Sequence, residues 1–347
     1  MIYNRPLKDC YISHKRDRDN LIPFLLGRNA INYLIESLSI KAIVLPSFIC
    51  PMLIDIFKHH QVDIFFYEGL NKQLQPPVDD ILTNLDKIQP QDQLFFLWHD
   101  YLNMIGDMPS KLYDYLAKNN IEPIIDATHS LPTKEYQALI VVFGFRKLLN
   151  EPFGALVKLN SNTTTVTTAS SPLLKLCLIL LVYRIKATLL YIFKFFNNST
   201  INKPLKMLSN IDHPLNFDSN HAFLYDNFQR RAIIDKHRRL DYQKISKRRQ
   251  RNFLRYVEKL PVLLNLEELD TSCPHGFPLL SNNNALTRKK LWDQGIHSFI
   301  LWSSLHKDLE NKKNNMSQYL SESIIVLPVN HDLSIKDIDR VIEVINE

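Results

Sequence analysis

Two stretches decide the fold class: "IEPIIDATHS", residues 121–130, and "YQALIVVFGFRKLLNEPFGALVKLN", residues 136–160. Each holds a run of apolar residues that ends abruptly, the first at Asp126 and the second at Arg146. A continuous apolar run is typical of a strand that is buried on both faces of a sheet. We therefore expect two buried strands, each followed by polar residues at its carboxyl end. Lys147 comes directly after the second strand.

The same pattern continues toward the N-terminus, where apolar runs alternate with segments of helical spacing. Strands alternating with helices indicate an α/β domain, with a mostly parallel sheet that helices cover on both faces. The predicted helices are 25–40, 51–61, 76–88 and 109–120, and the predicted strands are 42–45, 62–68 and 92–100.

The pattern changes after residue 160, and we predict two domains, a large and a small one. The terminal helix begins with Ser334 and Asp337, which match a capping box with an acid at its third position. A second helix, "ALTRKKLWDQGI", is expected to stop at Gly295. The predicted divisions are an N-terminal arm (1–21), a large α/β domain (22–215), a connecting helix (216–260, with 222–260 as one long helical stretch) and a small α+β domain (261–347).

Composition excludes several classes of protein. With 347 residues and 45% hydrophobic content, the chain can bury a large core. Its four cysteines are scattered without a C-x-x-C pair, so neither a zinc site nor a disulfide framework is supported. Glycine-rich dinucleotide and P-loop motifs are missing, as are metal-binding helices of the H-E-x-x-H type. The polar start of the sequence favours a cytoplasmic protein.

A first basic region spans residues 152–211, which contain seven Lys or Arg and no acidic residue. Its apolar part, 172–196, has Leu176 to Tyr183 as its longest uncharged run, too short for a membrane span of about 20 residues. Three interpretations remain: a buried or dimer-facing helical pair, a cationic helix on an anionic membrane surface, or an insertion into the membrane.

A second basic region, Arg230 to Arg255, holds eleven Lys or Arg and two Asp. It lacks interleaved aromatic residues and a known binding module, so nucleic acid is not the expected partner. The region is either a solvated helix between the domains or a source of arginines for an anionic, phosphate-bearing substrate.

The polar residues at the strand ends form the candidate site. Asp126 ends one strand, His129 follows in the same exit loop, and Lys147 follows the next strand. Ligands of open parallel sheets bind at such carboxyl ends. A buried carboxylate costs several kcal/mol unless a cation meets it. A lysine beside such a carboxylate is the pair that pyridoxal phosphate chemistry requires.

The order of the motifs "GRNA", "LPSFICP", "GDMPS", "IIDATHS" and "FGFRKLLNEPFGALV" resembles fold-type I pyridoxal phosphate enzymes of the aspartate aminotransferase fold. Within that fold the sequence is similar to the DegT-like sugar aminotransferases. The resemblance covers roughly residues 22–347 and includes "QGIHSFILW" and "VLPVNHDLS" near the end.

The resemblance implies a role for each motif residue. Lys147 would be the Schiff-base lysine and proton shuttle, Asp126 would pair with the pyridinium nitrogen, and His129 would lie near the phenolic oxygen of the cofactor. The remaining expected cofactor-binding residues are the stacking aromatic Phe48 and the phosphate-binding helix start at Gly27, Arg28 and Asn29.

One position departs from the family pattern. Gly144 stands three residues before the lysine, where the family has a phosphate-binding serine. A lost hydroxyl costs on the order of 1 kcal/mol or more at a charged acceptor. Backbone N–H groups, Arg28 or a second subunit could compensate; alternatively, the site has drifted and binds the cofactor weakly.

The resemblance implies an aminotransferase that moves an amino group from glutamate or another amino acid to a keto group, with a nucleotide-linked sugar as the expected acceptor. Another pyridoxal phosphate reaction, such as dehydration, is an alternative. So is a diverged, non-catalytic protein that binds a partner or a membrane surface. A homodimer is also expected from the resemblance.

Overall fold

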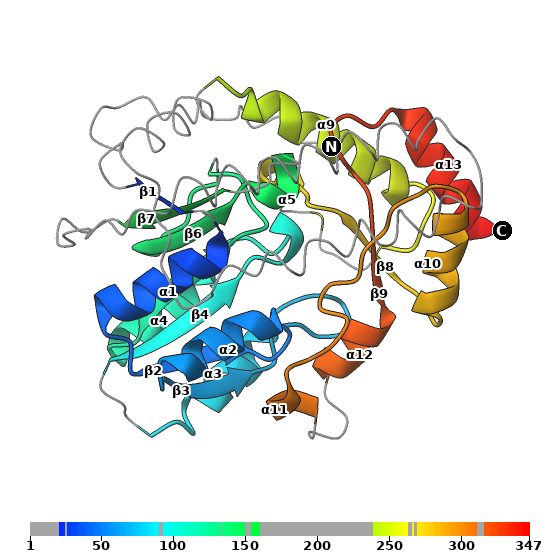
Figure 1. The fold of residues 1–347 in the computed structure, drawn as a ribbon. Coiled ribbons are helices and arrows are strands. Elements are labelled where there is room, and N and C mark those ends of the chain that lie inside the picture. Colours follow the sequence, from blue (N-terminus) through cyan, green and yellow to red (C-terminus); the bar gives the residue numbers. More distant parts are fainter. Residues whose placement is uncertain are drawn as a thin grey trace, which may run out of the picture.

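The computed structural model describes residues 21–24, 26–89, 93–132, 134–149, 154–159, 239–262, 266, 269–310 and 316–347 (Figure 1). The predicted N-terminal arm up to residue 20 and the apolar basic segment 172–196 lie outside the described residues, as do residues 216–238 of the predicted connecting helix.

A seven-stranded sheet organises the large domain, with the strand order β1-β7-β6-β5-β4-β2-β3. The strands β2 to β6 run parallel, whereas β7 is antiparallel to β6 and β1 is antiparallel to β7. This confirms the predicted α/β class with its mostly parallel sheet. The strands are β1 (Leu21–Phe24), β2 (Ala42–Pro46), β3 (Asp63–Tyr67), β4 (Leu94–His99), β5 (Glu122–Ala127), β6 (Ile140–Gly144) and β7 (Ala155–Leu159).

Helices cover both faces of this sheet (Figure 1). Successive strand residues point to opposite faces, so Ile43 joins one apolar cluster and Val44 the other. The first cluster contains α1 (Gly27–Leu38) and α2 (Pro51–His59), and the second contains α3 (Val78–Leu85) and α4 (Ser110–Lys118). Two short helical segments lie at the carboxyl edge of the sheet: η1 (Tyr101–Asn103) and α5 (Arg146–Leu149).

The C-terminal part is a smaller α+β unit around the antiparallel pair of β8 (Phe277–Leu280) and β9 (Ile324–Leu327). The predicted capping box is confirmed, because Ser334 and Asp337 bond reciprocally at the start of the last helix. Gly295, with φ of 72°, follows the end of α10 as predicted. The helices are α9 (Tyr242–Val257), η3 (Leu269–Thr271), α10 (Asn284–Asp293), α11 (Lys307–Glu310), α12 (Met316–Ser323) and α13 (Ile335–Asn346).

The single long helix predicted over 222–260 is wrong in its described part. Residues 239–241 are not helical, and α9 begins only at Tyr242. The Asp241 side chain accepts a hydrogen bond from the backbone N–H of Lys244 and so caps the helix. Aspartate favours this capping geometry over a helix interior, which explains the interruption.

None of the helices in the described part of the chain is long and apolar enough to cross a membrane.

Candidate active site at the carboxyl edge of the sheet

Asp126 lies at the carboxyl end of β5, in register with His99 at the end of β4 and with Val142 on β6. Its side chain is buried, with the residue only 2% exposed. The ring nitrogen Nδ1 of His99 donates to Oδ2 of Asp126 over 2.8 Å, and the N–H of Thr128 donates to Oδ1 over 3.1 Å. Both carboxylate oxygens are therefore held in place, and each keeps a lone pair for a further donor.

The surroundings keep Asp126 ionised. Burial by itself raises the pKa of this carboxyl, but the charge and hydrogen bond of His99, the charge of Lys147 and the Thr128 N–H outweigh it and lower the pKa to about 2. Asp126 is therefore a carboxylate at neutral pH, in a position where a cationic ring nitrogen could bind.

His129 is buried in the exit loop of β5, with only 1% of its surface exposed. Its Nδ1 accepts a hydrogen bond of 3.1 Å from the backbone N–H of Leu102, so the proton of the neutral ring is on Nε2. Burial, followed by the charge of Lys147, lowers the pKa of His129 well below its usual value. The ring therefore stays neutral and offers an N–H donor.

Lys147 is the second residue of α5, directly after β6, and its side chain is exposed. Its positive charge is close enough to lower the pKa values of both Asp126 and His129. The structure thus brings together the three residues that the sequence placed at consecutive strand ends.

Phe48 lies in a different setting from the one expected for a stacking residue. Its ring is fully buried, stacked on Tyr101 at a centroid distance of 5.9 Å and meeting the edge of Trp302 at 4.8 Å. The hydroxyl of Tyr101 also donates to the backbone carbonyl of Phe48 over 2.5 Å. Protein groups therefore cover the ring in this structure, and the stacking role of Phe48 stays a prediction.

The predicted phosphate-binding helix start is present at α1. Gly27 is its first residue, Leu26 is the N-cap without a side-chain cap, and the first turn has no acidic residue. Such a helix end carries partial positive charge and N–H groups that suit an anion. Asn29 is fully buried, and the guanidinium of Arg28 contacts Met52, with Nη1 3.4 Å from the sulfur.

Gly144, the last residue of β6, has no room for a side chain. A Cβ at this position would lie 2.5 Å from the backbone oxygen of Thr128 and 3.1 Å from its Cα. The exit loop of β5 occupies the space that the family's serine would need. The departure seen in the sequence is therefore a packing requirement of this chain.

Three aromatic residues of the site were missed by sequence reasoning: His99, Trp302 and His275. His99 had a usable signal, because "WHD" ends a buried strand just as "IID" does. The other two reach the site from the C-terminal part. His275 stacks on His129 at 5.0 Å, and Trp302 packs against His99 at 5.3 Å. No local pattern marks residues that approach from so far along the chain.

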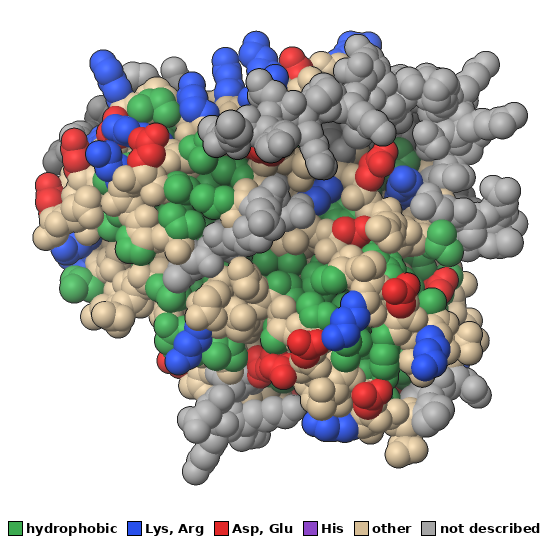
Figure 2. All heavy atoms as spheres, turned by 180° about the vertical axis from the view of Figure 1, so that it is seen from behind, with side chains coloured by type: hydrophobic (Ala, Val, Ile, Leu, Met, Phe, Trp, Pro, Cys, Tyr) green, Lys and Arg blue, Asp and Glu red, His purple; other side chains and the backbone are tan. Residues whose placement is uncertain are grey.

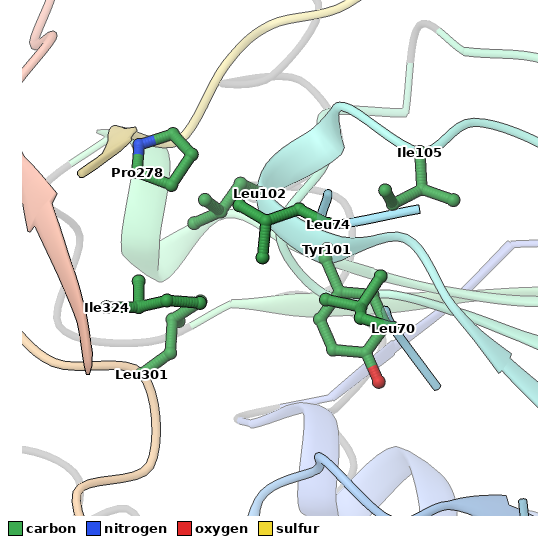
Figure 3. A pocket seen from close by; sticks show the side chains of 8 residues that line it. All are labelled: Leu70, Leu74, Tyr101, Leu102, Ile105, Pro278, Leu301 and Ile324. Carbon is green, nitrogen blue, oxygen red and sulfur yellow. The ribbon is translucent and has the colours of Figure 1, made fainter. Parts of the chain in front are cut away.

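A small apolar cavity lies beside the site, between η1 and the C-terminal part (Figure 3). Its volume is about 10 Å³, which holds one water molecule at most. It is therefore too small and too apolar for a substrate. Its lining residues are Leu70, Leu74, Tyr101, Leu102, Ile105, Pro278, Leu301 and Ile324.

The basic helix α9 carries both exposed and buried cationic side chains. Lys244, Lys247 and Arg248 are exposed, and Lys and Arg side chains line the upper edge of the molecule in Figure 2, the edge along which α9 runs in Figure 1. Arg249 instead points inward, is 1% exposed, and donates to the backbone oxygens of Leu148 at 2.9 Å and Pro274 at 3.0 Å. This arginine binds the chain itself and joins α9 to the segment that carries the lysine.

The residues present fit pyridoxal phosphate. The site has a buried carboxylate for the ring nitrogen, an N–H donor on His129, an amine on Lys147 and an uncapped helix start for the phosphate. Among the residues that the structure describes, the buried Nε2 of His99 has no hydrogen-bond partner, as expected where a polar ligand completes a site. Within the described ranges, no group of three or more His, Cys, Asp or Glu residues is placed to hold a metal ion.

Comparison with known proteins gives matches in structure but not in sequence. No family model matches the chain, and no curated protein matches it. A DegT DnrJ EryC1 StrS aminotransferase from Brucella abortus is 13% identical, with a TM-score of 0.61 over 94% of this chain and 85% of that one. The chain has the fold of these aminotransferases.

Two further aminotransferases of this fold give similar values. PseC from Helicobacter pylori, an aminotransferase involved in pseudoaminic acid biosynthesis, is 14% identical, with a TM-score of 0.60 over 94% of this chain and 85% of its own. The PLP form of Spr1654 from Streptococcus pneumoniae, named as a candidate sugar aminotransferase, is 12% identical with a TM-score of 0.62 over 94% and 86%. These similarities confirm the fold expected from the motifs.

Proposed function

We propose that the protein is a pyridoxal phosphate-dependent aminotransferase that moves an amino group from an amino acid, glutamate in the first instance, to a keto group of a nucleotide-linked sugar. The observation that carries the proposal is the buried, ionised Asp126 beside the charge of Lys147 at the ends of neighbouring strands. The fold of the solved aminotransferases supports the same reaction class.

When bound, pyridoxal phosphate supplies an aldehyde that holds an amine covalently and a ring that withdraws electrons from the neighbouring Cα–H bond. Asp126 would keep the ring nitrogen of the cofactor protonated, because its carboxylate would stabilise the positive charge there. His99 supports this role by fixing the carboxylate through its 2.8 Å hydrogen bond.

Lys147 and His129 would serve other atoms of the cofactor. With the cofactor bound, the Lys147 amine would hold its aldehyde covalently and, when released, would be the base that takes up and returns a proton. The Nε2–H of His129 would donate to the phenolic oxygen of the cofactor, and the Leu102 N–H keeps the proton on Nε2 by bonding to Nδ1. Because Lys147 is exposed, a bulky acceptor can reach it from solvent.

A sugar acceptor is proposed from the solved structures of this fold, several of which are named as sugar aminotransferases. The name of PseC gives a role in pseudoaminic acid biosynthesis. By analogy we propose that this protein serves surface polysaccharide biosynthesis in the cytoplasm as a homodimer. Peripheral contact with an anionic membrane through residues 172–196 is a further part of the proposal.

An absorption spectrum tests the reaction class. Purified protein incubated with pyridoxal phosphate should show a visible band that persists after desalting and is missing in Lys147→Ala. Adding glutamate should convert the band to the pyridoxamine form, and a screen of other amino acids should identify the preferred donor. A colourless protein, or a band unchanged in Lys147→Ala, would contradict the proposal.

A non-catalytic role in partner or membrane-surface binding is the second candidate. It is favoured by the exposed cations Lys244, Lys247 and Arg248 on α9 and by the acid-free residues 152–211. Cosedimentation with anionic and neutral vesicles at low salt tests it. Recovery in the supernatant with both kinds of vesicle would exclude membrane binding.

A further inference from the structure

Thr128 lies in close contact with two glycines of the site, Gly27 and Gly144. A Cβ at Gly27 would lie 2.7 Å from Cγ2 of Thr128, and a Cβ at Gly144 would lie 2.5 Å from its backbone oxygen. Both distances are well below ordinary van der Waals contact. Because the chain has only seven glycines, the placement of two of them against one threonine shows how closely the β5 exit loop is packed.

The position of Thr128 is fixed by the buried carboxylate. Its backbone N–H donates to Oδ1 of Asp126 over 3.1 Å, and the N–H of Ser130 closes the same turn by donating to the oxygen of Ala127 over 2.8 Å. One turn therefore carries the carboxylate of the site at one end and a threonine side chain at the start of α1 at the other.

The hydroxyl of Thr128 is available to a ligand. It makes no hydrogen bond among the described residues, and its residue is half-buried. The start of α1, which the Thr128 side chain approaches through Cγ2, has neither a side-chain cap nor an acidic residue in its first turn. Independently, the buried Nε2 of His99 in the same site has no hydrogen-bond partner within the described part of the chain, and His99 is 2% exposed. Two polar groups of the site, the Thr128 hydroxyl and Nε2 of His99, therefore make no hydrogen bond among the described residues.

We propose that the Thr128 hydroxyl donates to a phosphate monoester bound at the start of α1 and so replaces the serine that is missing at position 144. The loss of the serine and the use of Thr128 have one cause, because the loop that brings Thr128 to Gly27 also fills the space beside Gly144. The inference rests on the proposed function, since the phosphate monoester is that of the cofactor.

The test compares Thr128→Val, which keeps the shape and removes the hydroxyl, with Thr128→Ser, which keeps the hydroxyl. Dissociation constants are measured by absorbance for pyridoxal phosphate and for pyridoxal, which has no phosphate. A lost hydrogen bond to a charged acceptor should weaken pyridoxal phosphate binding about ten- to hundredfold in Thr128→Val. Binding of pyridoxal should be unchanged in both variants, and Thr128→Ser should bind pyridoxal phosphate as the wild type does.

A second readout uses inorganic phosphate alone. Phosphate should raise the melting temperature of the wild type and of Thr128→Ser, but not that of Thr128→Val; Thr128→Ala replaces the valine variant if that one does not fold. Equal affinity of the wild type and Thr128→Val for pyridoxal phosphate overturns the inference and leaves the proposed function intact. So does an equal loss of affinity for pyridoxal. A wild type that binds neither compound overturns both.

Discussion

Gly144→Ser would introduce the serine that the DegT-like sequences are expected to carry at this position, yet we expect it to weaken the protein. The new Cβ would lie 2.5 Å from the backbone oxygen of Thr128, about 1 Å inside ordinary contact. That oxygen cannot retreat freely, because the N–H of the same residue is bonded to the buried Asp126. Forcing atoms into a packed site costs about 1–3 kcal/mol, so the free energy of unfolding should fall by this amount.

Urea denaturation followed by circular dichroism measures the effect. The midpoint should shift to lower urea while the slope stays constant, which indicates a change in stability alone. Gly144→Ala is the matched control, because it introduces the same Cβ without the hydroxyl and should cost a similar amount. The affinity of Gly144→Ser for pyridoxal phosphate should not exceed that of the wild type.

A stable Gly144→Ser that binds pyridoxal phosphate more tightly would refute this reasoning. It would mean that the exit loop moves easily and that the glycine reflects a lost phosphate ligand. A large loss in Gly144→Ser with none in Gly144→Ala would also contradict it, because the clash belongs to the Cβ that both variants share.

Three further perturbations follow from the contacts of individual residues. The folded-state pKa of Asp126, about 2, lies below its unfolded value of 3.8. At about 1.4 kcal/mol per pKa unit, the ionised carboxylate adds about 2.5 kcal/mol to the free energy of unfolding above pH 4. This contribution is lost as the pH falls toward 2. His99→Phe removes the main cause of this low pKa, so acid unfolding should begin at a higher pH in a urea titration between pH 2 and 7; an unchanged pH profile would contradict the assignment. Arg249→Met leaves buried carbonyls without a donor and should lower the free energy of unfolding by at least about 1.5 kcal/mol, whereas an unchanged melting temperature would show that water replaces the guanidinium. Ser334→Ala breaks the capping box and should cost about 1 kcal/mol in the same assay, with Ser334→Asp as the control that keeps a cap.

The features predicted correctly from the sequence depend on local patterns. Continuous apolar runs predicted the parallel strands. Ser334 predicted the start of the last helix, and Gly295 predicted the end of an earlier one. The adjacency of Asp126 and Lys147 followed because parallel strands bring their carboxyl ends to one edge, which the pairing of β5 with β6 confirms.

The features that escaped prediction depend on three-dimensional packing. The bond between His99 and Asp126 requires the register of β4 against β5, and periodicity does not give a register. His275 and Trp302 lie about 150 and about 175 residues after Asp126 in the chain. The sequence shows the missing serine at Gly144 but not the backbone that fills its place, so it leaves open whether the exchange is compensated or weakens the site.

The hydrogen bond from Leu102 to His129 has a consequence for mutational robustness. Its donor is a main-chain amide, so exchanging the leucine side chain leaves the tautomer of His129 unchanged. Proline is the one exception, because it has no N–H and cannot adopt the φ of 56° found at this residue. The protonation of one ring nitrogen in the site is thus set by the main chain. Substitutions of the buried apolar side chain at this position do not change it.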